Sequence, residues 1–256
     1  MITLANRILC APFGKTHLFS VGQAGFILKS KTGQLFGIDL YLSDCVERIE
    51  GHDGYHRLMP KLLSPLEIGF DCIVATHPHY DHFDMDSIPQ IMDNPRTRLF
   101  ASVNCKQEVE RLRMLQSRIS YVKPGDKACV GDFQLTFTSC DHGQGAPDAV
   151  GLLLTVDKKR LFFAGDTCLR LDRLEEFLSE GSIDIMVAPI NGAYGNLNEG
   201  ECMQLANAVK PDLTIPCHFG MFASHGGSPG VFISEMNRNV PSLNYRLLTQ
   251  GEMLTL

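Results

Sequence analysis

One short segment constrains this chain more than any other, because residues 76–82 read Thr-His-Pro-His-Tyr-Asp-His. The segment follows the apolar run 72–75, which predicts a buried strand that ends in three imidazoles and a carboxylate. His77 and His79 are two residues apart, so in extended chain both rings point the same way, whereas His82 turns away. The spacing therefore offers ligands to two adjacent metal centres. Neutral imidazole and carboxylate suit zinc or manganese better than they suit soft ions.

Composition is typical of a soluble globular protein and disfavours several kinds of partner. Of the 256 residues, 44% are hydrophobic and 20% are charged, and no apolar run approaches the roughly 20 residues of a membrane helix. The first residues lack the basic start and apolar core of a signal peptide, and the nine cysteines form no CxxC pair. The net charge of −6 disfavours nucleic acid. We therefore expect a cytoplasmic protein with no membrane or nucleic-acid partner.

The pattern of apolar residues indicates strands early in the chain and alternating strands and helices later. Strands are expected at 25–29, 35–40, 71–76, 98–101, 133–137, 150–156, 161–164, 183–188 and 213–215, and helices at 84–92, 103–115, 171–178, 199–209 and 231–237. Two sheets packed face to face, with helices outside, would bury this pattern. We therefore predict an α/β (α+β) fold in one domain, residues 1–256, in which the polar segment 44–63 forms short helices or a mobile flap over the site.

Three further ligand candidates stand where a predicted strand gives way to a small or polar loop. They are His142 in Cys-Asp-His-Gly, Asp166 in Ala-Gly-Asp-Thr, and His218 in Cys-His-Phe-Gly. Binding sites gather at such strand ends because rigid strands fix the loops that follow them. Asp148 also lies beside a predicted strand, and a supporting role near the metals and a simple bracing role in its loop are equally compatible with its position.

The order His77-x-His79-x-Asp81-His82, followed by His142, Asp166 and His218, resembles the metallo-β-lactamase superfamily. This resemblance implies a four-layer αββα sandwich with a two-metal site at one edge. Carried over by position, His77, His79 and His142 would hold the first metal, Asp81, His82 and His218 the second, and Asp166 would bridge the two. Zinc and manganese both accept these ligands.

Within that superfamily the chain most closely resembles the L-ascorbate-6-phosphate lactonase group. The resemblance rests on the segments 37–41, 64–66, 122–126, 189–192 and 215–219. It implies a homo-oligomeric lactonase that opens a lactone or ester bond in a small sugar-acid phosphate, such as L-ascorbate 6-phosphate. The chain looks shorter than members of that group at its N-terminus and before the strand that leads to the metal motif.

The charge of such a site predicts how the reaction would run. Two divalent cations contribute +4 and two ionised aspartates remove two charges, so the centre lowers the pKa of its bound water, typically to about 7. A hydroxide that bridges the metals would attack the carbonyl, and Asp81 would deliver the water proton to the leaving oxygen. His142 or a metal-bound water could do the same work. The expected catalytic residues are therefore Asp81, His142 and the bridging Asp166.

A phosphorylated substrate also needs a cation away from the metals, and the best candidates lie in the segment 44–63. Arg57 could hold phosphate in a bidentate way and Lys61 could act as a point charge, with His52 and His56 nearby; a solvated helix face is the alternative. The resemblance places the loop that carries Asn191 and Tyr194 near the metals, although a plain Asn/Gly turn explains it equally well. His17 and His225 are expected to be ordinary loop histidines, with residues 225–228 as an alternative rim of the site.

Three other functions use the same residues. A phosphodiesterase or nuclease could employ the same dinuclear site, although the acidic net charge disfavours long nucleic acid. A redox di-iron protein of the same superfamily is less favoured, because those proteins generally carry a carboxylate where this chain has His79. A metal-dependent binding or regulatory protein without turnover is the third alternative.

Overall fold

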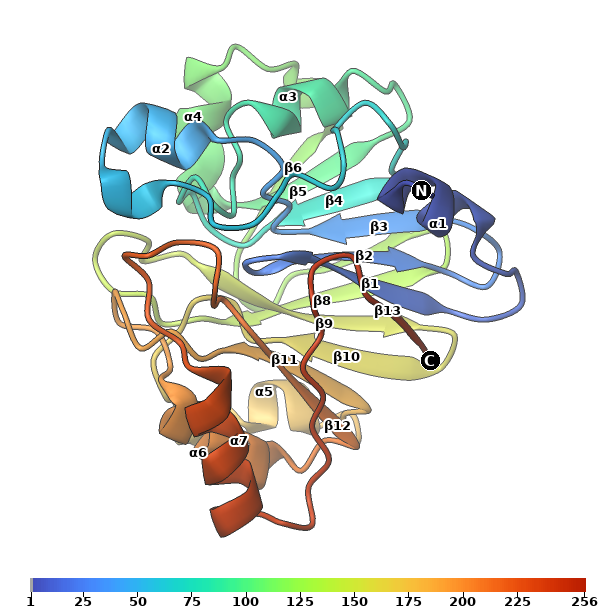
Figure 1. Ribbon diagram of the computed structural model, residues 1–256. Coiled ribbons are helices and arrows are strands. Elements are labelled where there is room, and N and C mark those ends of the chain that lie inside the picture. Colours follow the sequence, from blue (N-terminus) through green and yellow to red (C-terminus); the bar gives the residue numbers. More distant parts are fainter. Residues whose placement is uncertain (1) are drawn as a thin grey trace.

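The computed structural model describes residues 2–256 and contains two β-sheets that lie face to face (Figure 1). The first sheet runs in the order β13 (Met253–Thr255), β1 (His17–Gly22), β2 (Gly25–Lys29), β3 (Leu35–Ile38), β4 (Cys72–Ala75), β5 (Arg98–Ser102) and β6 (Ile119–Val122). The second runs in the order β12 (Leu213–Cys217), β11 (Ile185–Pro189), β10 (Lys159–Phe163), β9 (Val150–Val156), β8 (Phe133–Ser139) and β7 (Lys127–Val130).

Helices cover the outer face of each sheet. Above the first sheet lie α1 (Leu4–Cys10), α2 (Cys45–Glu50), α3 (Ser87–Met92) and α4 (Lys106–Arg111), and below the second lie α5 (Glu175–Leu178), α6 (Glu199–Val209) and α7 (Pro229–Asn239) (Figure 1). The predicted sandwich of two sheets between two helical layers is therefore confirmed. Within residues 2–256 no helix combines the length and apolar character that a membrane crossing would need.

The layers are held together by three apolar cores. The central core lies between the sheets, where Phe36 packs on Phe133 at 5.5 Å between ring centroids and Phe26 packs on Phe163 at 5.9 Å. One outer core lies between the first sheet and its helices, and another lies between the second sheet and its helices. Each fully buried phenylalanine contributes roughly 1.5–3 kcal/mol to the free energy of unfolding, so the sandwich is a rigid base for the loops at its edge.

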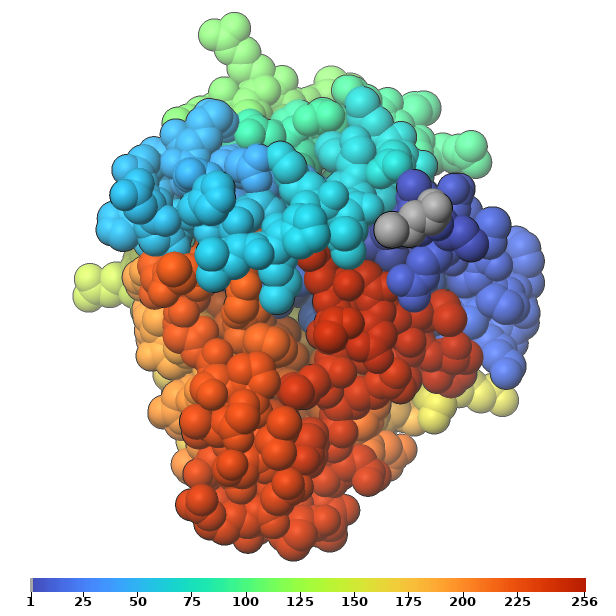
Figure 2. All heavy atoms as spheres, in the orientation of Figure 1, coloured from blue at the N-terminus to red at the C-terminus, as the bar shows by residue number. Residues whose placement is uncertain are grey.

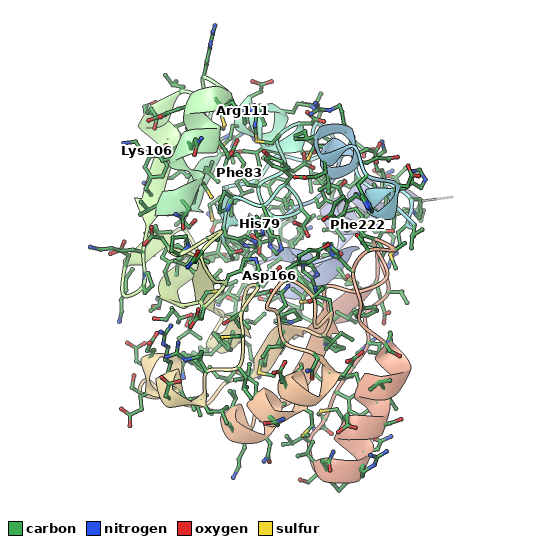
Figure 3. All side chains as sticks on the ribbon, turned by 90° about the vertical axis from the view of Figure 1, so that its left-hand side faces the viewer. His79, Phe83, Lys106, Arg111, Asp166 and Phe222 are labelled. Carbon is green, nitrogen blue, oxygen red and sulfur yellow. The ribbon has the colours of Figure 1, made fainter. Side chains whose placement is uncertain are left out.

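Parallel pairing brings strand ends from both sheets to one edge. In the first sheet β3, β4, β5 and β6 pair in parallel, and in the second β10, β11 and β12 do the same. The carboxyl ends of parallel neighbours share an edge, and loops at such an edge are held in fixed positions relative to one another. Figure 3 views the molecule from this edge, with His79 and Asp166 near its centre.

The structure differs from the sequence-based expectation mainly in the lengths of the outer helices. The helix predicted at 103–115 is a 3₁₀ turn (Val103–Cys105) followed by the short α4, because Arg113 adopts a left-handed φ of 53° that ends the helix. The helix predicted at 84–92 starts only at Ser87, because the Asp84 carboxylate accepts hydrogen bonds from the amides of Ser87 and Leu42 and holds a loop instead. Strands β1, β6 and β7 were not predicted.

The segment 44–63 forms α2 and a 3₁₀ turn (Asp53–Tyr55), and it contacts the C-terminal part of the chain. Arg57 pairs with Phe222 in an isolated antiparallel bridge, and the amide of Leu58 donates to the carbonyl of Met221 at 2.9 Å. Figure 2 shows this light-blue to cyan segment meeting the orange and red residues across one face of the molecule. The segment therefore joins the two helical layers on one side of the site.

Candidate metal centre

Seven polar side chains from four separate strand ends meet at the shared edge of the two sheets. Four of the ligand candidates lie on the loop that follows β4, and the loops after β8, β10 and β12 provide one each; the full set is His77, His79, Asp81, His82, His142, Asp166 and His218. All except His79 are buried. Gly165 has a φ of 69°, and a Cβ there would lie 3.0 Å from the carbonyl oxygen of Val150, so the turn before Asp166 requires glycine.

Three imidazoles form the first ligand group, which consists of His77, His79 and His142. The Nε2 atoms of His77 and His142 each lie 3.0 Å from Nδ1 of His79. Ligands bonded at about 2.0–2.1 Å to one ion lie about 3.0–3.4 Å apart. The three nitrogen atoms therefore stand at the spacing that a shared cation requires, and Nδ1 of His142 is buried without a hydrogen-bond partner.

The second ligand group consists of Asp81, His82 and His218, with Asp166 beside it. Nε2 of His218 lies 3.1 Å from Oδ2 of Asp166, 3.3 Å from Oδ2 of Asp81 and 3.3 Å from Nε2 of His82. Oδ2 of Asp166 also lies 3.4 Å from Nε2 of His82, and Asp166 can join His77 and His82 in a further cluster of ligand atoms. Asp166 therefore lies within reach of ligand atoms from both groups.

The two ligand groups differ in charge. Burial lowers the pKa of His142 to about 4 and holds the pKa of His77 well below its ordinary value, so these rings are neutral at pH 7. Burial also opposes the charged form of His218, but the carboxylates of Asp166 and Asp81 outweigh it and raise the pKa to about 9. The first group is thus ready to bind a cation, whereas the second must release protons to do so.

Asp39 supports the second ligand group. In the sequence it belongs to the segment 37–41, which carries part of the family resemblance, and it is not itself a predicted site residue. It follows β3 with a left-handed φ of 47°, and its carboxylate accepts hydrogen bonds of 2.8 Å from the backbone amide and hydroxyl of Thr76. Its Oδ2 lies 2.9 Å from Nδ1 of His82, so Nε2 of that ring points at Asp166. A carboxylate behind a ligating histidine fixes the orientation of the ring. The sequence signal was the same as for Asp166: an acid directly after an apolar strand.

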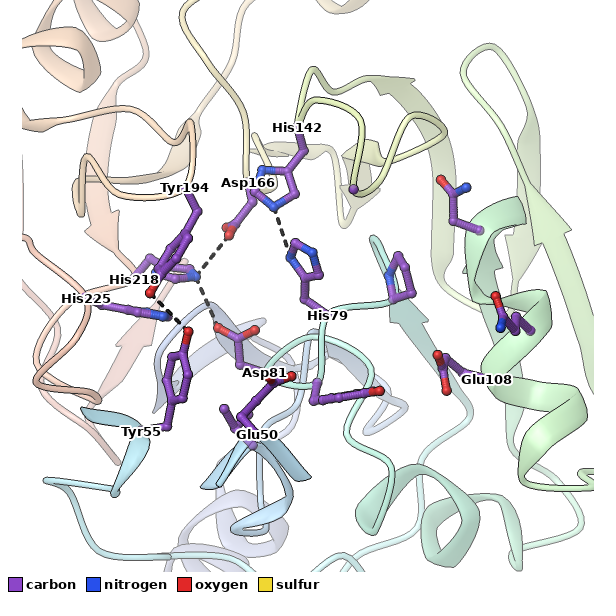
Figure 4. A pocket seen from close by; sticks show the side chains of 16 residues that line it. Glu50, Tyr55, His79, Asp81, Glu108, His142, Asp166, Tyr194, His218 and His225 are labelled. Carbon is purple, nitrogen blue, oxygen red and sulfur yellow. Dashed lines mark hydrogen bonds and ion pairs between the residues drawn. The ribbon is translucent and has the colours of Figure 1, made fainter. Parts of the chain in front are cut away.

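The ligand groups form one side of a pocket of about 450 Å³ (Figure 4). The hydroxyl groups of Tyr55 and Tyr194 lie 3.0 Å apart beside it, and the ring of His225 stacks on that of His218 at 5.1 Å. The opposite wall carries the polar residues Asn104, Gln107 and Glu108, and Glu50 extends it. None of the described residues that line the pocket is lysine or arginine.

The structure does not bring the predicted phosphate-binding residues to this pocket. The guanidinium of Arg57 is buried, donates to the carbonyl oxygens of Tyr41, Ser43 and Met59, and stacks over the ring of Tyr41 at 4.7 Å. Lys61 pairs with Asp44 on the outer surface. His52 caps the 3₁₀ turn, and His56 pairs with Glu47. Arg57 is thus occupied in joining backbone segments, and neither Arg57 nor Lys61 lines the pocket, so the phosphate contact stays a prediction.

The loop after β11 reaches the centre, but through a residue that the sequence did not single out. The side-chain amide of Asn196 donates to Oδ2 of Asp166 at 2.7 Å and to Oδ1 of Asn191 at 3.1 Å. Asn191 is therefore two contacts away from the ligands, whereas Tyr194 lines the pocket directly. His225 also lines the pocket. This histidine therefore fits the alternative of a rim at residues 225–228 better than it fits an ordinary loop histidine. Asp148 contacts the pocket wall, since its backbone amide donates to the side chain of Asn104 and its carboxylate accepts from the same side chain.

Comparisons with known proteins identify the family and the fold. A family model described as the beta-lactamase superfamily domain matches residues 41–219, which include all seven ligand candidates. A UPF0173 metal-dependent hydrolase from Polynucleobacter asymbioticus is 24% identical over 260 residues, covering 93% of this chain and 86% of that protein. A structure described as a possible metal-dependent hydrolase from Veillonella parvula has a TM-score of 0.75 at 18% identity and covers 95% of this chain and 100% of that chain.

A further solved structure, Igni18, a metallo hydrolase from Ignicoccus hospitalis, has a TM-score of 0.71 at 17% identity and covers 94% of this chain and 98% of that chain. These neighbours confirm the predicted metallo-β-lactamase fold. Since the family model spans well over half of the chain and contains the whole ligand set, the chain belongs to the beta-lactamase superfamily domain family.

Proposed function

We propose that this protein is a metal-dependent hydrolase that opens a lactone or ester bond in a small polar molecule. The observation that carries the proposal is the convergence of five imidazoles and two carboxylates beside an open pocket. Figure 4 shows the five of these residues that line the pocket, which are His79, Asp81, His142, Asp166 and His218. The relative from Polynucleobacter asymbioticus, which bears the name of a metal-dependent hydrolase, supports the same class of reaction.

The donor set fits two divalent cations, with Mn²⁺ and Zn²⁺ as the proposed ions. One would be held by the three imidazoles of the first ligand group, and the other by Asp81, His82 and His218, with Asp166 in reach of both. When bound, such ions act as Lewis acids on a carbonyl oxygen and lower the pKa of a water molecule to about 7.

Asp81 is the residue best placed to move a proton. Burial opposes its charged form, but His82 and His218 hold the pKa of its carboxyl well below the ordinary value, so Asp81 is ionised at neutral pH. Its carboxylate lines the pocket and can accept the proton of the attacking water and pass it to the leaving oxygen. His142 is neutral and also lines the pocket, so it is the alternative acceptor.

The two tyrosines hold and orient the substrate in this proposal. The hydrogen bond with Tyr194 raises the pKa of Tyr55 to about 12, so this phenol keeps its proton throughout the neutral range. A bound carbonyl or hydroxyl group can take one of the two phenolic protons in place of the contact between them. The ligand side of the pocket then handles the reacting bond while the tyrosines fix the remainder of the molecule.

The lining favours a neutral lactone over a sugar-acid phosphate such as L-ascorbate 6-phosphate. The described lining residues offer carboxylate, amide and phenol groups, which suit the hydroxyl groups of a sugar. A phosphate would have to reach the rim, where Arg111 donates to the hydroxyl of Tyr80 at 3.2 Å (Figure 3). Both substrates belong in the first assay, because the cation of Arg111 contacts the lining residues Tyr80 and Glu108.

The proposal is tested by loading the purified protein with Mn²⁺ or Zn²⁺ and supplying neutral sugar lactones, L-ascorbate 6-phosphate, aryl esters and a cyclic phosphodiester. We expect turnover of a lactone or ester that a chelator abolishes and added metal restores. Cleavage of the phosphodiester alone would transfer the proposal to the phosphodiesterase class. Binding of metal with no turnover of any substrate would favour a binding or regulatory protein.

A further inference from the structure

A glutamine that the sequence analysis did not consider lies against the second ligand group. Gln23 is in the turn between β1 and β2, is 4% exposed, and has a left-handed φ of 53°. Such a conformation costs a non-glycine residue of order 1–3 kcal/mol and persists only where the surroundings impose it. Its backbone carbonyl accepts a hydrogen bond of 2.9 Å from the amide of His218. The turn therefore fixes Gln23 to the same strand end that presents His218.

The end of the Gln23 side chain stands at ligand-to-ligand spacing from two members of this group. Its Nε2 lies 2.8 Å from Oδ2 of Asp81 and 3.2 Å from Nε2 of His218. The spacings among Asp81, His82, His218 and Asp166 themselves are 3.1–3.7 Å. The amide of Gln23 thus lies close to the same space that Asp81, His82, His218 and Asp166 surround.

The hydrogen bonding of this amide is incomplete. Nε2 has two hydrogens but lies within 3.3 Å of acceptor atoms on Asp81, His218 and His225, while Oε1 is buried without any partner. A buried carbonyl without a partner costs about 1–3 kcal/mol. The two ends of a carboxamide have nearly the same shape, and a half-turn of the amide exchanges them. Oε1 would then face Asp81 and His218. Once His218 has released its proton, all three atoms are acceptors, and a cation among them satisfies them together.

We propose that Gln23 is a further ligand of the cation held by Asp81, His82 and His218, through its amide oxygen. This inference rests on the proposed function only in assuming that the second ligand group binds an ion. An additional neutral oxygen raises the number of ligands and makes the set harder, which favours Mn²⁺ over Zn²⁺ at this position. The first ligand group, made of three imidazoles, gains no such oxygen, so the two positions differ in their preference.

The test measures metal binding and needs no substrate. Protein stripped by a chelator is titrated with Mn²⁺ and with Zn²⁺, and bound metal is counted by mass spectrometry and by competition with a chromogenic chelator. Gln23→Ala should keep the first ion and weaken the second at least about tenfold. Gln23→Glu, which retains an oxygen at the same place, should restore the second ion or bind it more tightly.

Gln250→Ala is the matched control, because this amide donates to the carbonyl of Val21 beside the same turn and makes no hydrogen bond to a ligand candidate among the described residues. It should bind both ions as the unchanged protein does, and circular dichroism of the stripped proteins checks that each variant is folded. If Nε2 of Gln23 serves only as a donor to Asp81, then Gln23→Glu repels that carboxylate and weakens the second ion as much as Gln23→Ala, which would overturn the proposal. Unchanged affinity in Gln23→Ala would overturn it too, whereas a protein that binds no metal in any form would instead refute the proposed function.

Discussion

The two sides of the pocket are built in different ways. The ligand side stands on the ends of β4, β8, β10 and β12, which are strands of the two packed sheets. The opposite side is made of α2, two 3₁₀ turns, the short α4 and the loop after β11. The ligand side carries histidines and aspartates at spacings that suit bound cations, and the wall carries tyrosines, amides and two glutamates. The ligand side determines the reaction, and the opposite wall determines which substrates fit the pocket.

This contrast predicts that the ligand side tolerates little change. A ligand at the end of a packed strand is held in place by the core, and its loss leaves the neighbouring ligands buried without a charge partner. A wall residue on a short helix is partly solvated, so its loss alters the fit of a substrate by a small amount. Substitutions on the two sides should therefore differ by orders of magnitude in their effect on activity.

The largest effect is expected for Asp166→Asn, which removes the charge between the two ligand groups. We expect kcat/KM to fall by at least about 10³-fold and bound metal to drop below that of the unchanged protein, because Asp166 contacts His82 and His218 at once. Metal content and steady-state rates on the best lactone measure this. The control is Asp148→Asn, which changes an aspartate on the exposed loop before β9 and should keep full activity. An Asp166→Asn variant with normal rates would remove the distinction between the sides.

A smaller loss is expected for Asp39→Asn, which spares every ligand and changes only the group behind His82. The variant keeps the oxygen that accepts from the amide of Thr76, but it replaces Oδ2, which accepts from the Thr76 hydroxyl, and loses the charge that faces Nδ1 of His82. Partners behind a ligating histidine typically contribute 10–100-fold to metal affinity, and we expect a loss in that range. Chelator competition at pH 7.5 measures it. An affinity equal to that of the unchanged protein would show that the ring is oriented by packing alone.

The pH dependence of stability should also separate the two ligand groups. In metal-free protein the carboxylates raise the pKa of His218 to about 9, against about 6.5 in the unfolded chain. Its contribution to stability is therefore complete below pH 6.5 and is lost as the pH rises through 9. We expect the Tm of chelated protein to fall by several degrees between pH 7 and pH 10, and that of metal-loaded protein to fall less. A Tm of chelated protein that is flat or rises in this interval would contradict the charge assignment.

The same contrast shows what the sequence could reveal. His77, His142, Asp166 and His218 were found because a strand ending in a polar loop leaves a local pattern of apolar and polar residues. The wall leaves no such pattern: Arg57 and Glu108 are both charged residues in polar segments, and only their tertiary contacts bury one and place the other in the pocket. The positions of Gln23 and Asn196 likewise depend on backbone turns that a single sequence does not specify. The sandwich followed from periodicity, while the lengths of its outer helices depended on turns such as that at Arg113.

On the wall, Glu108→Gln tests whether charge selects the substrate. The side chain of Glu108 is 15% exposed and its nearest cation is Nη1 of Arg111 at 3.6 Å. An exposed charge contact is worth about 0.2–1 kcal/mol, or at most about fivefold in affinity. We expect KM to rise up to about fivefold for an ester with an ammonium group and to fall for an anionic one. Glu110→Gln, on the same helix but paired with Lys106 and away from the lining, is the control. Equal changes for all substrates would exclude a charge effect.

The smallest effect on substrate choice is expected for Arg57→Ala, because this guanidinium holds the wall together from behind. It donates to the carbonyl oxygens of Tyr41 and Ser43, and its removal leaves those buried groups without partners. We expect the free energy of unfolding to fall by about 1–3 kcal/mol, while the ratio of KM for a phosphorylated lactone to KM for its unphosphorylated form stays the same. Urea unfolding and steady-state kinetics on the two lactones measure these quantities. A selective rise in KM for the phosphorylated lactone would mean that Arg57 reaches the pocket after all, and the wall would then contribute a cation to recognition. A loss of stability with an unchanged ratio of KM values would mean that the wall offers only acidic and uncharged groups to the substrate. The strong positive charge in the pocket would then come from the cations on the ligand side alone.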